Sequence, residues 1–112
     1  MSYDFMMFKP VGEVKSPNDL SEETTAVIGS DEEIRHALSR LYPEIDWQDG
    51  QFGSLNASDK WYEFRLYDPK GKSFAICTSH GAGERLLVPE ICRALGLVAF
   101  DGQLSQLIRG ED

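Results

Sequence analysis

The sequence predicts one α+β domain over residues 1–112, an antiparallel sheet with two helices packed on one face. Three observations lead to this prediction. The length of 112 residues is that of one ordinary domain. Apolar residues make up 41% of the chain, enough for a core without disulfides or metals. Segments of strand and helical periodicity follow in the order β-α-β-β-(β)-α-β, which predicts a ferredoxin-like, split βαβ arrangement.

The first half of the chain contains a strand, a long connection and a helix. Residues 3–8 alternate like a strand, and both faces are largely apolar, which indicates a central strand covered on both sides. Residues 11–29 form a connection that is long for a compact domain, with room for one short helical turn. Ser30 and Glu33 have the spacing of a capping box, and apolar residues at helical spacing follow until Pro43.

A hairpin is the strongest feature of the second half. Residues 51–55 are a candidate edge strand, and residues 61–67 have the composition most typical of a strand. Residues 68–71 read Asp-Pro-Lys-Gly, which is turn chemistry with glycine where a positive φ is wanted. Residues 73–79 form the return strand.

A second helix and a final strand follow the hairpin. The helix lies within residues 84–95 and begins near Val88, because Pro89 is tolerated only in a first turn. Gly96 is a natural C-terminal stop. Residues 97–100 predict a short strand, and residues 104–108 either another strand or a docked helical turn.

The formal net charge of −8 is unevenly distributed. Residues 1–49 hold eleven acidic side chains against four basic ones. This balance argues against nucleic acid and anionic membranes as ligands and permits a basic protein partner. The alternative is that the acids only keep the surface soluble. The N-terminus has no signal-peptide pattern and no apolar run is long enough to span a membrane, so we expect a soluble cytoplasmic protein.

The cysteines and histidines do not form a recognisable reactive site. Cys77 and Cys92 lie in apolar surroundings and are predicted to be reduced, buried thiols. Two cysteines and two histidines at unrelated spacings make a poor zinc site, so neither a metal nor another cofactor is predicted.

The segment of residues 79–84 is a possible anion-binding loop. His80, Gly81 and Gly83 precede the second helix, and glycines there let backbone N–H groups converge on an anion. The alternative is a connection that needs positive φ angles. His80 is a candidate general base, with Glu84 or Asp101 to orient it, yet a lone loop histidine does not define a catalytic site. No catalytic residue is therefore assigned, and we expect a protein that is not an enzyme.

The candidate partner-binding residues are aromatic and acidic. Trp61 and Tyr67 share a predicted strand face with charged side chains, a combination typical of binding surfaces. The alternative is that the connection of residues 11–29 covers this face. The full predicted set comprises Glu22, Glu23, Asp31, Trp47, Trp61 and Tyr67. Asp31 is also explained as a helix N-terminal residue.

Two stretches carry a resemblance to a known class of proteins. They are Met1-Ser2-Tyr3-Asp4-Phe5-Met6-Met7-Phe8-Lys9-Pro10 and Ile91-Cys92-Arg93-Ala94-Leu95-Gly96-Leu97-Val98-Ala99-Phe100-Asp101-Gly102-Gln103. Both resemble small bacterial immunity proteins encoded beside polymorphic or contact-dependent toxins. Where such families show Asp-Pro-Gln after the last strand, this chain has Asp-Gly-Gln at residues 101–103, so no functional residue is carried over.

The resemblance implies a cytoplasmic protein that binds and blocks one toxin domain. The acidic composition of the chain favours a basic domain as that partner. Two alternatives stay open. One is a small anion- or nucleotide-binding domain or enzyme that uses residues 79–84. The other is a regulatory domain whose acids confer only solubility.

Overall fold

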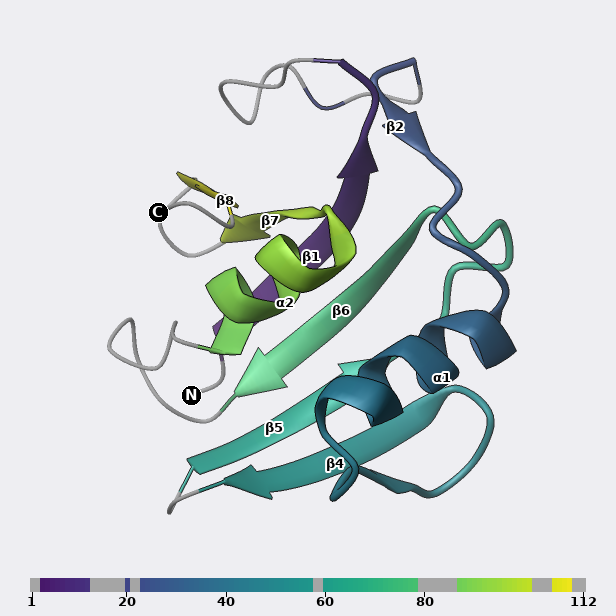
Figure 1. The fold of residues 1–112 in the computed structure, drawn as a ribbon, viewed down its shortest axis with the longest axis vertical. Helices are drawn as coiled ribbons and strands as arrows, with labels where there is room; N and C mark the ends of the chain where they lie inside the picture. Colours follow the sequence, from purple (N-terminus) through teal and green to yellow (C-terminus); the bar gives the residue numbers. More distant parts are fainter. Residues whose placement is uncertain are drawn as a thin grey trace.

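The computed structural model describes residues 3–12, 20, 23–57, 60–78, 87–101 and 106–109. These residues form strands and two helices around one core (Figure 1). The elements are β1 (Tyr3–Pro10), β2 (Thr25–Ala26), α1 (Asp31–Leu41), β3 (Asp46–Trp47), β4 (Phe52–Ala57), β5 (Lys60–Arg65), β6 (Ser73–Thr78), α2 (Leu87–Leu95), β7 (Val98–Asp101) and β8 (Gln106–Arg109). The predicted α+β class is confirmed.

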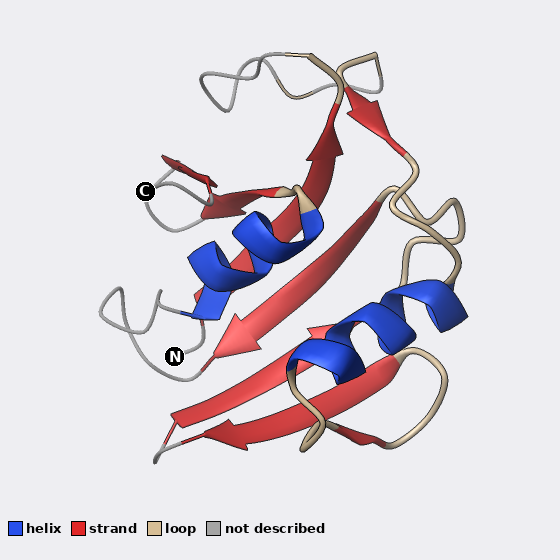
Figure 2. Cartoon of the chain, in the orientation of Figure 1, coloured by secondary structure: helices blue, strands red, loops and turns tan. Residues whose placement is uncertain are grey.

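An antiparallel sheet of eight strands is the scaffold. Its order is β3-β4-β5-β6-β1-β7-β8, and β2 pairs with the end of β1. Every described strand pair is antiparallel. Both helices lie on the same side of this sheet, α1 over β4 and β5 and α2 over β1 and β6 (Figures 1 and 2).

The expected split βαβ order is not found. That order places β1 beside and parallel to the second strand of the hairpin. Here β1 pairs antiparallel with β6 on one side and with β7 on the other. Along the chain, four strands lie between α1 and α2, namely the two-residue β3 and then β4, β5 and β6. Each pairs antiparallel with the next, and β6 pairs antiparallel with β1, so the sheet is wholly antiparallel.

The helix boundaries follow the local chemistry of the sequence. The Ser30 hydroxyl accepts a hydrogen bond from the Glu33 N–H at 3.1 Å, and the Glu33 carboxylate accepts one from the Ser30 N–H at 3.0 Å. These bonds complete the predicted capping box and hold the pKa of Glu33 below its usual range. Pro89 lies in the first turn of α2, where its missing N–H costs no helical bond. Gly96, with φ of 68°, follows the last turn.

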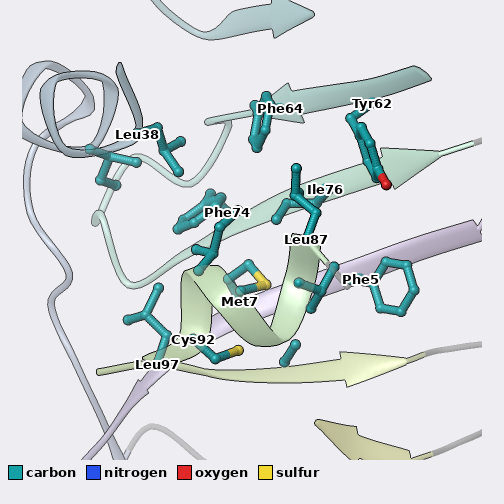
Figure 3. Close-up of a cluster of buried hydrophobic side chains, with 14 of the residues drawn as sticks. Phe5, Met7, Leu38, Tyr62, Phe64, Phe74, Ile76, Leu87, Cys92 and Leu97 are labelled. Carbon is teal, nitrogen blue, oxygen red and sulfur yellow. The ribbon is translucent and has the colours of Figure 1, made fainter. Parts of the chain in front are cut away.

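The core fills the space between the helices and one face of the sheet (Figure 3). The strands contribute alternate residues, so Phe5 and Met7 of β1 face the helices while their neighbours face away. α1 contributes Leu38, and α2 contributes Ile91 and Cys92. The Cys92 thiol lies 3.7 Å from the Ile108 carbonyl oxygen and donates a hydrogen bond to it, which ties α2 to β8. Both cysteines are buried thiols that form no disulfide with each other, as predicted.

Candidate protein-binding face

The side of the sheet that faces away from α1 and α2 is the candidate site, and we call it the open face. Strand alternation places a second set of side chains there, opposite to those of the core. Its described members include Asp4, Met6, Phe8, Asp46, Phe52, Ser54, Asn56, Trp61, Glu63, Arg65, Ser73, Ala75, Cys77, Val98, Phe100 and Leu107. The prediction that β1 is covered on both sides is not met by the two helices, because both lie over the core face.

A row of mostly apolar side chains, interrupted by Arg65, crosses the open face from β4 to β8, and we call it the apolar row. Successive pairings place its members directly opposite one another on six neighbouring strands. The row is Phe52, Arg65, Ala75, Met6, Phe100 and Leu107. All six are partly exposed. With strands about 4.8 Å apart, the five steps span roughly 24 Å, a length on the scale of one partner's share of a standard interface.

A shorter polar row lies beside the apolar one. Glu63 pairs with Cys77, and Cys77 pairs with Asp4. Burial raises the pKa of the Cys77 thiol to about 12, and its hydrogen bond to the Asp4 carboxylate adds to the effect. A thiol that keeps its proton is a poor nucleophile and a poor metal ligand. The open face is therefore suited to binding by contact and not to covalent chemistry at Cys77.

Three residues of the types favoured at the centre of interfaces come from β5 and the segment that follows it. Trp61 is half-buried, the Arg65 side chain is 42% exposed, and Tyr67 is 58% exposed. The Arg65 guanidinium lies 3.4 Å from the Glu63 carboxylate, which is itself mostly buried. Trp, Tyr and Arg are the side chains most enriched among residues that dominate binding energy. Strand alternation places Trp61, Glu63 and Arg65 on the open face, whereas Tyr67 follows the end of β5 and its place on that face stays a prediction.

Trp47 lies elsewhere, on the helix-covered side of the sheet. Its indole N–H donates a hydrogen bond to the Ser39 hydroxyl of α1 at 2.9 Å. Its ring centroid lies 6.3 Å from that of Phe64, and a Cβ at Gly53 would meet its ring at 2.6 Å. The glycine leaves room for the indole to lie flat on β4. Trp47 therefore packs α1 onto the sheet and does not join Trp61 and Tyr67.

The predicted acidic residues lie away from the open face where they are described. Asp31 begins α1, and its carboxylate accepts a hydrogen bond from the Gln51 side chain at 3.3 Å. Glu23 is exposed in the turn before β2. Glu22 lies outside the described residues. On the open face itself the described exposed acids include Asp4 and Asp46, which the sequence patterns did not single out.

The candidate anion-binding loop, with His80, Gly81 and Gly83, lies outside the described residues. Asp101, the proposed partner of His80, is fully buried opposite Phe5 on the core side. Within the described ranges, no three His, Cys, Asp or Glu side chains are grouped to hold a metal ion. Neither α1 nor α2, the helices of the described part, has the length and apolar character needed to cross a membrane.

Sequence reasoning missed the apolar row because its members come from strands far apart in the chain. Met6 and Phe100 are adjacent only after β1 and β7 pair. The signal was present in part, since apolar residues occur on both faces of β1. That pattern was interpreted as double coverage of a buried strand. An apolar second face also occurs where a partner supplies the cover.

Two groups with raised pKa values predict a loss of stability at alkaline pH. Burial and the Glu90 carboxylate raise the pKa of Tyr42, whose hydroxyl donates a hydrogen bond to Glu90 between the helices. Burial likewise raises the pKa of Cys77 to about 12, against about 8.5 in an unfolded chain. The folded state keeps a proton on the Cys77 thiol that the unfolded state loses. The contribution of this thiol to the free energy of unfolding is therefore fully present below pH 8.5 and is lost as the pH rises towards 12.

We expect each such proton to lower the free energy of unfolding by about 1.4 kcal/mol per pH unit within its window. Urea unfolding followed by tryptophan fluorescence between pH 7 and pH 11 measures the slope. Cys77→Ala should remove the fall in the free energy of unfolding that begins near pH 8.5. Tyr42→Phe should remove the fall that begins near pH 10. Identical slopes in the wild type and in both variants would contradict this assignment.

No family model, no curated protein and no solved structure matches this chain.

Proposed function

We propose that this chain is a protein-binding domain whose open face docks onto a partner, and that the partner is a toxin domain that the chain neutralises. The observation that carries the proposal is the partly exposed apolar row on the open face, with Tyr67 58% exposed beside it. A single exposed apolar side chain is ordinary on a protein surface. A row aligned across six paired strands needs a reason, and cover by a partner supplies one.

The chemistry of the open face supports a protein as the partner. Met6 and Phe100 provide a continuous apolar strip, while Arg65 and Tyr67 add groups that can both pack and hydrogen-bond. Interfaces combine an apolar centre with a polar rim in this manner. Asp4, which is exposed beside the strip, offers a carboxylate to a cationic side chain of the partner.

The finer proposal, an immunity protein, is supported by charge and by the resemblance of the two terminal stretches. The net charge of −8 would speed the encounter with a basic toxin domain. An inhibitor of this type acts by covering the substrate cleft and needs no catalytic group of its own. The raised pKa of the Cys77 thiol on the same face is in keeping with that mode of action.

Substitution of Trp61 and Tyr67 tests the proposal. We expect Trp61→Ala/Tyr67→Ala to lose a partner that the tagged wild type captures from its native lysate at moderate salt. We also expect expression of that partner alone to arrest growth, co-expression with the wild type to restore it, and co-expression with the variant to fail. Each truncation at the centre of an interface typically costs about 2 kcal/mol or more, roughly a 30-fold rise in Kd.

Val27→Ala is the matched control, because Val27 is 53% exposed but lies in the connection from β2 to α1. It should capture and protect as the wild type does. Thermal melting of the double variant separates lost binding from lost folding. If a folded double variant still protects against the toxic partner, the open face is not the inhibitory surface. If the captured partner has no effect on growth, binding stands and the immunity assignment fails.

A further inference from the structure

The polar row of the open face extends beyond the pairing of Glu63, Cys77 and Asp4. Ser54 of β4 pairs with Glu63 on one side and with Asp46 of β3 on the other. The polar row therefore runs over five neighbouring strands, from β3 to β1. Its described members are Asp46, Ser54, Glu63, Cys77 and Asp4. The outermost two, Asp46 and Asp4, are exposed.

The polar row and the apolar row lie side by side on β4, β5, β6 and β1. On each of these strands a member of one row lies two residues from a member of the other, as Glu63 does from Arg65 and Asp4 from Met6. Two residues along a strand span about 6.8 Å. A partner that lies across the strands therefore meets a polar stripe and an apolar stripe roughly 7 Å apart.

The spacing within both rows fits the turns of an α-helix. Successive members lie on neighbouring strands, about 4.8 Å apart. A helix rises about 5.4 Å per turn, so side chains three or four residues apart meet about one strand per turn. An extended chain places the side chains of one face about 6.8 Å apart, which is farther than the strands are from one another. A helix with its side chains is about 10 Å wide, enough to cover both stripes.

The charges of the two rows select the sign of the partner. Among their described members, the carboxylates of Asp4, Asp46 and Glu63 outnumber the one guanidinium, that of Arg65. Arg65 lies 3.4 Å from Glu63 and offsets its charge. Asp4 accepts a hydrogen bond from the Cys77 thiol, and a carboxylate has further lone pairs for a second donor. The exposed carboxylates of Asp4 and Asp46 are thus the groups that a cationic partner meets.

We infer that the open face receives a basic amphipathic α-helix of the partner, which lies across the strands. Its apolar side chains follow the apolar row, and its lysines or arginines reach Asp4 and Asp46. Four strand steps separate these two acids, roughly 19 Å, which is about 13 residues of helix. The inference rests on the proposed function and adds the element of the partner that is bound and the acids that select it.

Titration with a synthetic helical peptide, followed through the amide NMR spectrum, tests the inference. The peptide has about 18 residues, long enough to cross the sheet, with leucines along one stripe and lysines along the next. We expect saturable shifts at the amides of Met6, Ser54 and Ala75. A peptide with glutamate in place of lysine should not bind, and a peptide of the same composition in scrambled order should bind far more weakly.

Asp4→Asn/Asp46→Asn should raise the Kd for this peptide about fivefold, because each of two exposed ion pairs contributes a factor of about two to three. Glu32→Gln/Glu44→Gln is the matched control. It removes two negative charges from exposed residues of α1 and of the turn after it, away from the open face. At about 0.15 M salt, where charges farther than about 8 Å are largely screened, the control should leave the Kd unchanged.

Equal binding of the ordered and scrambled peptides would overturn the inference, as would the absence of saturable shifts. An unchanged Kd in a folded Asp4→Asn/Asp46→Asn variant would do the same. A concentration-dependent dimer that shifts the same amides without peptide would assign the face to a second copy and also overturn it. If the peptide fails while Trp61→Ala/Tyr67→Ala still loses the captured partner, the proposed function stands and only the helix is removed.

Discussion

Gly71→Ala is expected to destabilise the fold by about 3 kcal/mol or more. Gly71 has φ of +68°, where an alanine costs about 1–2 kcal/mol. A Cβ at this position would also lie 2.1 Å from the carbonyl oxygen of Gly29, which is backbone and cannot rotate away. The Gly71 carbonyl oxygen accepts a hydrogen bond from the Ile28 N–H at 2.7 Å, so a shift of the turn breaks the contact that leads into α1.

Gly12→Ala separates the cost of a positive φ from the cost of the contact with the Gly29 carbonyl oxygen. Gly12 has a similar φ of +77°, and no atom of the described residues lies within 4 Å of the position of its Cβ. Its substitution should therefore cost about 1–2 kcal/mol, the contribution of the backbone conformation alone. Urea unfolding of both variants gives the difference in free energy directly. Equal destabilisation by the two substitutions would mean that the approach of Gly29 to Gly71 contributes nothing.

Phe64→Ala is expected to cost about 3–5 kcal/mol, the range for a large buried aromatic side chain. Phe64 is fully buried at the centre of β5, and its ring packs against that of Trp47. Its removal leaves a cavity beneath α1 that the rigid sheet cannot close. A typical domain has 5–15 kcal/mol of stability in total, so this variant should unfold far more readily than the wild type in denaturant.

Phe100→Ala is the matched control for that prediction, because Phe100 is only half-buried and faces away from the helices. We expect it to cost about 1 kcal/mol. Chemical denaturation of the two variants measures the contrast. Similar losses in both would show that the open face is as well packed as the core, which would remove the main argument for a binding surface there.

Local chemistry allowed much of the fold to be predicted from the sequence. The capping box at Ser30 and Glu33, the turn that ends at Gly71, and the start of α2 two residues before Pro89 all depend on neighbours within a few residues. Such features are decided by steric and hydrogen-bonding rules that act along the chain. The structure places each of them where the sequence indicated.

The strand order could not be predicted in the same manner, because pairing between distant strands leaves no local signal. The hairpin of β5 and β6 was predicted, but the antiparallel pairing of β6 with β1 was not, and that pairing removes the split βαβ order. The two-residue strands β2 and β3 were not predicted, since they exist only through pairing with β1 and β4. Short edge strands of this kind carry little periodicity of their own.

The candidate site also contains residues that the local sequence predicts and residues that only strand pairing places. Trp61 was predictable from alternation along β5, which places it on the face of Glu63 and Arg65. Tyr67 lies past the end of β5, so its place on that face stays a prediction. Trp47 was grouped with them on residue type alone, and its packing against Phe64 depends on the pairing of β3 with Gly53. Met6 and Phe100 joined the site only through the pairing of β1 with β7.

The affinity of Tyr67→Ala for the captured partner tests the central claim most directly. Tyr67 is the most exposed large apolar side chain described, so its truncation should change binding while leaving the melting temperature unchanged. We expect the Kd to rise by about 30-fold or more, and that of Val27→Ala to equal the wild-type value. Equal affinities of the wild type, Tyr67→Ala and Val27→Ala would contradict the assignment of the open face as the binding surface.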